Sequence, residues 1–381
     1  MADIKTHLRE LSVATTIGLL INGTNFKLQD LYDSRKFFTF AEQVITDDIS
    51  SAKNLCTQPT FSGELKQIVD NGYNLGKKIF DSSYFVINKG DLITWQGNNT
   101  QKDDPIDITV GKYGFSLKEE SFILENMGLY KLLNCYTGSN YKKRHIFSDY
   151  ARPEYENWFT VTWNELINHL SKNNNTWSYD NSLKHKKGII TLDDSKVIFK
   201  YFLNGKLDTT STLQKTCTLS DFESKTSSKT REEVFAKFIK QNLERNQKYN
   251  ESKKACAIAA TKALANELKT NLNYNAGLPR FLRIHNKEYY YAKTTTAGIE
   301  IYKVPPLKSF GDDIVIESIE ASVPDTQANI LTTIKNKKTG RTLVLRNECR
   351  FSHGQFNGTP EAKMYYEHGG SLLVIYEAIQ K

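Results

Sequence analysis

The sequence predicts an α/β fold in which a mixed β-sheet is flanked by helices, joined to a basic region of mixed helices and strands. Three observations lead to this prediction. In the first 120 residues, apolar stripes with helical spacing are followed by short extended runs. A long helical tract covers 229–270, and six or seven apolar runs of strand length follow residue 280. Hydrophobic residues form 39% of the chain and charged residues 25%, which is the balance of an ordinary globular protein.

The N-terminal part is predicted to be mainly helical. Leucines and isoleucines recur at near-helical spacing over residues 1–50, with a break at 22–23. A second helix is expected over 62–80, because Ser62 can cap it and an apolar stripe follows from Leu65 to Leu75. Residues 83–97 then have the composition of extended chain.

The most informative stretch is 104–121, DPIDITVGKYGFSLKEES. Its proline disfavours helix at the residue before it, and the runs on either side of Gly111 are typical of two strands joined by a tight turn. In such a hairpin Asp107 and Lys118 project from neighbouring strands toward one point. A carboxylate and an ammonium close together are the minimum set of side-chain groups for metal-assisted phosphodiester hydrolysis. The apolar period of residues 122–133 predicts a helix after the hairpin.

The rest of the chain is divided by a polar linker at 173–182, NNNTWSYDNS. Before it we expect a charged loop at 139–152, a strand near 158–163 and a short helix. After it we expect a hairpin over 188–203 that turns at 193–194, then the helical tract and the strands. The linker predicts a boundary between a region 1–175 and a region 176–381.

Charge is concentrated in one block. The net charge of the chain is +8, and residues 181–300 hold 22 lysines and arginines against 12 acidic residues. A basic block beside a near-neutral remainder suits binding to a polyanion. The five cysteines are scattered, without the short spacings of a zinc site, which favours reduced thiols in a cytoplasm. No apolar run is long enough for a membrane span, and no signal-peptide core begins the sequence.

The Asp107–Lys118 hairpin resembles the active-site hairpin of the PD-(D/E)xK nucleases, above all the type II restriction endonucleases. The resemblance covers about 18 residues. The family motif has an acid two residues before the lysine, and Ser116 occupies that position here. By the resemblance, another carboxylate completes the metal shell. The alternatives for this carboxylate are Glu119, Glu120 and Glu64. Glu64 lies on a helix before the sheet, as the corresponding glutamate does in many restriction enzymes.

The resemblance implies sequence-specific, Mg²⁺-dependent cleavage of double-stranded DNA by a homodimer. Asp107 would hold the metal with Glu64 or Glu119, and Lys118 would orient the attacking water and stabilise the transition state. The chain has no P-loop, GxGxxG or GxSxG motif, so no nucleotide cofactor is expected.

A second polar segment, RNECRFSHGQFNGTPEAK at 346–363, is expected to be largely loop. Arginine, asparagine and glutamine match base edges in the major groove, while lysines hold phosphates. We therefore expect DNA contacts from eight of its residues: Arg346, Asn347, Arg350, Ser352, His353, Gln355, Asn357 and Lys363.

Two alternatives stay open. A rival catalytic core could be formed by Asp325, Glu348 and Arg350 with Lys363 nearby, although arginine is uncommon in the lysine's role. A hydrolytic role for His353 alone has less support, because no second histidine or zinc pattern accompanies it. The chain could also be a non-enzymatic nucleic-acid-binding protein with a degenerate nuclease fold, which the serine at position 116 would fit.

Overall fold

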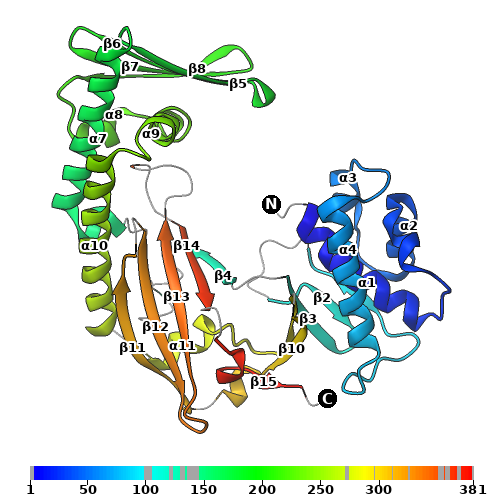
Figure 1. The fold of residues 1–381 in the computed structure, drawn as a ribbon. Helices are drawn as coiled ribbons and strands as arrows, with labels where there is room; N and C mark the ends of the chain where they lie inside the picture. Colours follow the sequence, from blue (N-terminus) through cyan, green and yellow to red (C-terminus); the bar gives the residue numbers. More distant parts are fainter. Residues whose placement is uncertain are drawn as a thin grey trace.

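The computed structural model describes residues 4–97, 105–119, 123–128, 134, 146–270, 274–295, 297–310, 312–324, 327–350, 356, 361–366 and 370–379. The strands form three sheets, of six, five and four strands, and helices pack on each of them (Figure 1). The chain therefore has a mixed α/β fold with helices flanking the sheets, which confirms the predicted fold class.

The six-stranded sheet is the mixed one. Its strands lie in the order β1 (Ile93–Trp95), β2 (Ile108–Val110), β3 (Tyr113–Glu119), β9 (Tyr289–Thr295), β10 (Gly298–Val304) and β15 (Glu377–Ala378). β3 and β9 run parallel, and the other neighbours are antiparallel. Residues 120–288 are inserted between β3 and β9, so the sheet combines strands from 1–175 with strands from 176–381.

Two N-terminal helices, α1 (Ile4–Ile21) and α4 (Gly63–Phe80), pack against each other and contact this sheet. Glycines allow their close approach, because a Cβ added at Gly72 would lie 2.4 Å from Cβ of Ser12. Their apolar side chains share a core with one face of the sheet, including Leu11, Ile17, Ile68, Leu75, Phe115 and Leu117. The smaller helices of this part are η1 (Leu28–Tyr32), α2 (Ser34–Val44) and α3 (Ser50–Leu55).

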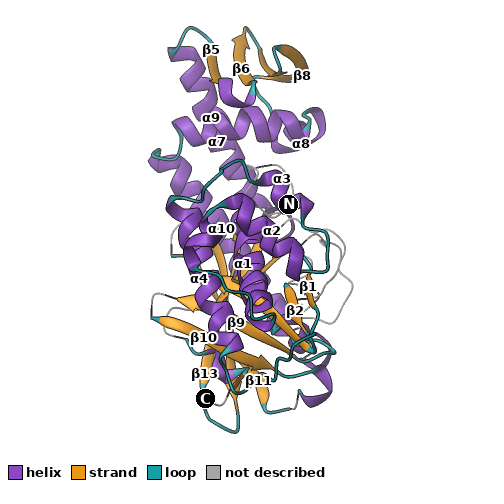
Figure 2. Ribbon diagram, turned by 90° about the vertical axis from the view of Figure 1, so that its right-hand side faces the viewer, coloured by secondary structure: helices purple, strands orange, loops and turns teal. Residues whose placement is uncertain are grey.

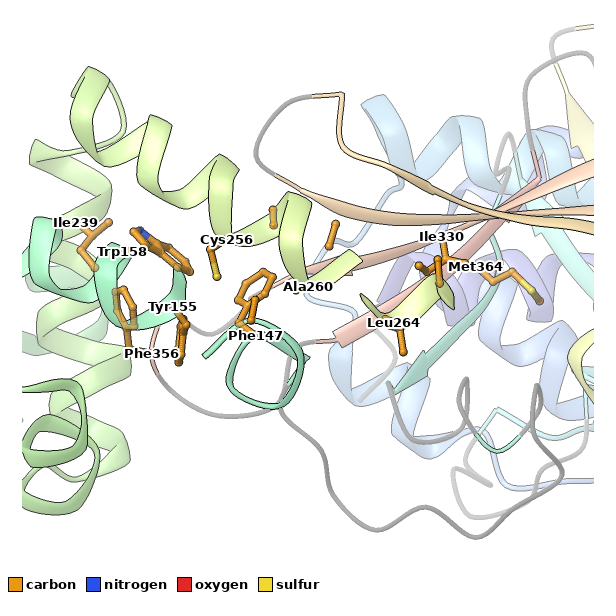
Figure 3. Packing of buried hydrophobic residues seen from close by; sticks show 14 of the residues in the cluster. Phe147, Tyr155, Trp158, Ile239, Cys256, Ala260, Leu264, Ile330, Phe356 and Met364 are labelled. Carbon is orange, nitrogen blue, oxygen red and sulfur yellow. The ribbon is translucent and has the colours of Figure 1, made fainter. Parts of the chain in front are cut away.

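The five-stranded sheet is antiparallel, in the order β11 (Ile314–Ser322), β12 (Ala328–Asn336), β13 (Thr342–Arg350), β14 (Glu361–Tyr366) and β4 (Ile123–Gly128). The long helix α10 (Gln247–Thr270) packs on β11 and β12. Figure 3 shows Ala260 and Leu264 of α10 in the same buried cluster as Ile330 and Met364 of the sheet.

The helix predicted over 122–133 is wrong, because its first half is the edge strand β4. Residues 123–128 pair antiparallel with β14, more than 200 residues later in the chain. A local apolar period is a weak predictor where a distant strand offers backbone hydrogen bonds. The segment 346–350 likewise extends strand β13 rather than forming loop, and β14 begins at Glu361.

The four-stranded sheet is a meander of β5 (Thr176–Asn181), β6 (Lys186–Asp193), β7 (Lys196–Leu203) and β8 (Lys206–Gln214). It lies at one end of the molecule, next to helices α7 (Arg152–Lys172), α8 (Leu219–Lys225) and α9 (Ala236–Asn242) (Figure 2). The predicted hairpin turn at 193–194 is confirmed, and Asp194 adopts a positive φ of 48° there. The helical tract is also confirmed, as the π-helix η3 (Thr230–Phe235), α9 and α10.

The strand predicted near 158–163 is wrong, because these residues lie in the middle of α7. Buried residues recur along that helix at a helical spacing: Tyr155, Trp158, Phe159, Thr162, Trp163, Leu166 and Leu170. The predicted linker at 173–182 is a tight turn followed by β5, with Asn174 and Asn175 at positive φ. The remaining short helices are α6 (Ile146–Tyr150), η2 (Ser182–Lys184), α11 (Tyr274–Phe281), η4 (Leu307–Ser309) and η5 (Leu372–Val374). Within the described ranges, none of the helices combines the length and apolar composition that crossing a membrane requires.

Candidate active site

The structure brings Asp107 and Lys118 together on the β2–β3 hairpin. The two strands pair antiparallel around Gly111, whose positive φ of 55° suits a tight turn. Asp107 directly precedes β2, and Lys118 lies near the end of β3. The Nζ atom of Lys118 is 3.7 Å from Oδ2 of Asp107, and each side chain is about three-quarters buried. The predicted convergence of these two groups is therefore confirmed.

Asp107 is held in place by the backbone of the opposite strand. Its Oδ2 atom accepts a hydrogen bond of 2.6 Å from the backbone N–H of Leu117. Ser116 is buried, and its hydroxyl donates to the same oxygen at 3.5 Å. Ser116 thus orients Asp107 but contributes no carboxylate of its own.

A candidate second acid is Glu10 of α1, which sequence reasoning missed. Its side chain is buried, with the residue 4% exposed, and its Oε2 accepts a 2.8 Å hydrogen bond from Nε1 of Trp95 on β1. Burial, and next the negative charge of Asp107, raise the pKa of Glu10 to about 7, against the opposing effects of Trp95, Arg9 and Lys118. The charge of Asp107 therefore acts on the carboxyl group of Glu10.

The acids expected at this place lie elsewhere. Glu64 is in the first turn of α4, as predicted, but its side chain is 64% exposed and forms a 2.5 Å ion pair with Lys5. Glu119 is the last residue of β3, opposite Thr294 of β9, and its side chain lies outside the described atoms. Glu120 lies outside the described residues. Glu10, rather than Glu64, is therefore the helix-borne carboxylate whose pKa responds to the charge of Asp107.

Cations surround the two carboxyl groups. The pKa of Lys118 is lowered, mainly because its ammonium is partly removed from water, and the charges of Arg283 and Arg9 lower it further while Asp107 and Glu10 oppose them. Arg9 precedes Glu10 on α1, and Arg283 follows α11 with a positive φ of 60°. Three positive groups thus act on one small region that contains two carboxylates, which suits an anionic ligand.

The two carboxylates suit Mg²⁺, which needs few protein ligands, better than a metal ion whose ligands all come from the protein. The hydrogen bonds from Trp95 and Leu117 go to Oε2 of Glu10 and Oδ2 of Asp107, so they do not occupy the other oxygen of either carboxyl group. No group of three or more metal-ligating side chains is found among the described residues. Mg²⁺ is commonly held by one or two carboxylates, with water and substrate phosphate completing its shell.

The second polar segment is divided between two faces of the five-stranded sheet. Arg346 stacks its guanidinium 4.4 Å from the ring centre of Tyr365 and lies 3.8 Å from the carboxylate of Glu348. Lys363 stands opposite Glu348 on β14 and is partly exposed. Asn347 is fully buried, so its side chain does not reach solvent in this structure.

The other predicted DNA-contacting positions cannot be placed. The side chain of Arg350 lies outside the described atoms, and the same holds for the whole of Ser352, His353, Gln355 and Asn357. In the rival catalytic core, Asp325 is also outside the described residues. Glu348 has Arg346 as an ion-pair partner, whereas Asp107 has Lys118.

No family model, curated protein or solved structure matches this chain. The site is therefore defined by its own geometry.

Proposed function

We propose that this protein is a Mg²⁺-dependent endonuclease that cleaves double-stranded DNA at specific sequences, in the manner of the type II restriction endonucleases. The observation that carries the proposal is the pairing of Asp107 with Lys118 on the β2–β3 hairpin, with the charges of both acting on the buried Glu10. A carboxylate pair with a lysine 3.7 Å from one member, on a strand hairpin backed by a helix, provides the groups needed for metal-assisted phosphodiester hydrolysis.

Each residue has a defined part in this proposal. Glu10 and Asp107 would hold the metal, while Trp95 and the backbone N–H of Leu117 keep their carboxylates in place. A bound Mg²⁺ ion supplies positive charge that stabilises the developing negative charge on the phosphate. Lys118 orients the attacking water and places its ammonium beside the same phosphate. Arg9 and Arg283 add to the positive potential that draws the DNA backbone to the site.

The partner we propose is duplex DNA in the cytoplasm. The excess of lysine and arginine in residues 181–300 supports contacts with phosphates. Arg346 and Lys363 are the described candidates for contacts outside the catalytic sheet, because their side chains are partly exposed. Cutting both strands of one duplex requires two active sites, which favours a homodimer.

The test is digestion of unmethylated phage DNA by the purified protein with Mg²⁺, compared with the same reaction in EDTA. Discrete fragments that require Mg²⁺ are expected. A smear would indicate cleavage without sequence specificity, and intact DNA across a range of phage genomes would contradict the proposal.

The second candidate function is a non-enzymatic DNA-binding protein, which the missing acid at position 116 favours. A calorimetric titration with Mg²⁺ or Ca²⁺ separates the two functions. The nuclease proposal predicts binding that is lost in Glu10→Gln and in Asp107→Asn. A degenerate site would bind no divalent cation in the presence of DNA.

A further inference from the structure

One end of the four-stranded sheet combines exposed leucines with lysines. Two segments meet there: 182–187 leads from β5 into β6, and 203–207 turns from β7 into β8. The backbone N–H of Asn204 donates a 2.8 Å hydrogen bond to the carbonyl oxygen of His185, so the two segments lie side by side. Residues 182–187 and 203–207 are called the leucine–lysine end below.

Three leucines of this end are in contact with solvent. The exposed fraction is 94% for Leu183, 54% for Leu207 and 36% for Leu203. Leu207 stands opposite Phe202 in the strand register, and Leu203 follows Phe202 on the other face of the sheet. Single exposed leucines are common on protein surfaces, but several at one end of a sheet indicate contact with a partner.

The turn between β7 and β8 has a defined shape. Asn204 and Gly205 both have positive φ, of 51° and 75°, which is the two-residue turn that asparagine followed by glycine favours in a hairpin. The leucines on either side of the turn are therefore presented by ordered backbone. A surface that is ordered before binding loses little conformational entropy when a partner binds.

Lysines surround these leucines. The leucine–lysine end contains four lysines, one histidine and no acidic residue. Lys186 forms a 2.6 Å ion pair with Glu233 of η3. The other three, Lys184, Lys187 and Lys206, are exposed and form no ion pair with the described part of the chain. Three available positive charges suit an anionic partner.

Duplex DNA is the anionic partner that accounts for both the lysines and the leucines. A two-stranded β-ribbon fits into a groove of DNA, where phosphates border the bases on both sides. Several DNA-binding proteins place apolar side chains against base steps while nearby cationic groups contact phosphates. The leucines lie at the narrow end of a hairpin rather than on a broad apolar face, which suits a groove better than a lipid surface.

We propose that the leucine–lysine end binds duplex DNA, with its lysines on backbone phosphates and its exposed leucines against the floor of a groove. The inference rests on duplex DNA being the partner in the proposed function. Figures 1 and 2 show the four-stranded sheet at one end of the molecule, apart from β2. This contact therefore adds affinity for DNA and takes no part in hydrolysis at the Asp107 hairpin.

The first experiment tests the lysines by measuring how the full-length protein binds a fluorescent duplex of phage sequence in EDTA, over a range of salt concentrations. The triple variant Lys184→Ala, Lys187→Ala, Lys206→Ala should bind more weakly. Its slope of log affinity against log salt should be smaller by about 2–3, because each phosphate contact contributes about 0.9. The matched triple arginine variant keeps the charges and should keep the wild-type slope.

The second experiment tests the leucines in the same assay. Leu183→Ala with Leu207→Ala should weaken binding by about 10-fold while leaving the salt slope unchanged, because apolar contacts release no counterions. Leu307→Ala, which shortens an exposed leucine on η4, is the matched control and should bind like the wild type. If thermal unfolding shows that the double variant is unstable, Leu183→Ala alone carries the test, since its side chain is almost fully exposed.

Wild-type affinity and salt slope in both sets of variants would overturn the inference. It is also overturned if the leucine variant binds DNA normally but loses binding to phosphatidylserine vesicles or loses self-association in sedimentation, because the surface would then contact lipid or a second copy. Binding is measured without Mg²⁺, so absence of cleavage contradicts the proposed nuclease without affecting this inference. A wild-type protein that binds no duplex overturns both.

Discussion

Replacing Glu10 with glutamine should slow cleavage strongly and at the same time stabilise the metal-free protein. The amide oxygen of glutamine can still accept the hydrogen bond from Trp95, so the change removes the charge and little else. Loss of one of two metal-holding carboxylates should lower the cleavage rate by about 10²–10³, the usual effect of removing one well-placed electrostatic group.

The gain in stability follows from the pKa of Glu10. Burial, and next the charge of Asp107, raise this pKa from its ordinary value of 4.5 to about 7. A group whose pKa is higher in the folded state binds protons more tightly there, so the free energy of unfolding falls as pH rises from 4.5 through 7. At about 1.4 kcal/mol for each pKa unit, ionised Glu10 costs the folded state about 3 kcal/mol above pH 7.

The assay is chemical denaturation of the wild type and Glu10→Gln in EDTA, at several pH values between about 4.5 and 8. The two proteins should have nearly equal stability at the acidic end, and the variant should be more stable by about 3 kcal/mol at the alkaline end. A variant that is less stable at pH 8, or equally stable at every pH, would refute the view that Glu10 is a buried carboxylate held next to Asp107.

Three further predictions concern other parts of the molecule. Lys118→Ala should cleave about 10²–10³ times more slowly while still binding divalent cations, and a near-normal rate would remove Lys118 from the mechanism. Arg346→Ala should lose about 1–3 kcal/mol of discrimination between cognate and random duplexes, and an equal loss of affinity for every sequence would mean that Arg346 does not read bases. The double variant Lys248→Ala, Lys254→Ala should instead weaken binding to all duplexes alike and flatten its salt dependence. Gly72→Val should lower the free energy of unfolding by about 1–3 kcal/mol, because a Cβ there meets Ser12 at 2.4 Å, and an unchanged denaturation midpoint would contradict close packing of α1 on α4.

Features built from neighbouring residues could be predicted from the sequence. The hairpin that brings Asp107 to Lys118 needs only a turn at Gly111 between two alternating strands, and the hydrogen bond from Leu117 to Asp107 spans 10 residues. The turn at 193–194 was predictable for the same reason. In both cases local backbone preference and strand pairing favour the same structure.

Features that depend on distant packing could not be predicted. Glu10 reaches the site because α1 packs on β1, and its partner Trp95 lies 85 residues away. One signal was present: Glu10 is the single acidic residue in the helix Ile4–Ile21. Strand β4 was mistaken for a helix because its partner β14 lies far along the chain.

The most direct test of the proposed site is Mg²⁺-dependent cleavage by Asp107→Ala, with Asp208→Ala as a control that removes an exposed aspartate from β8. Asp107→Ala should leave phage DNA intact while binding it at least as tightly as the wild type, because the change removes both the metal site and a negative charge that faces phosphate. Asp208→Ala should produce the wild-type fragments. Retained cleavage by folded Asp107→Ala would contradict the assignment of the active site to this hairpin.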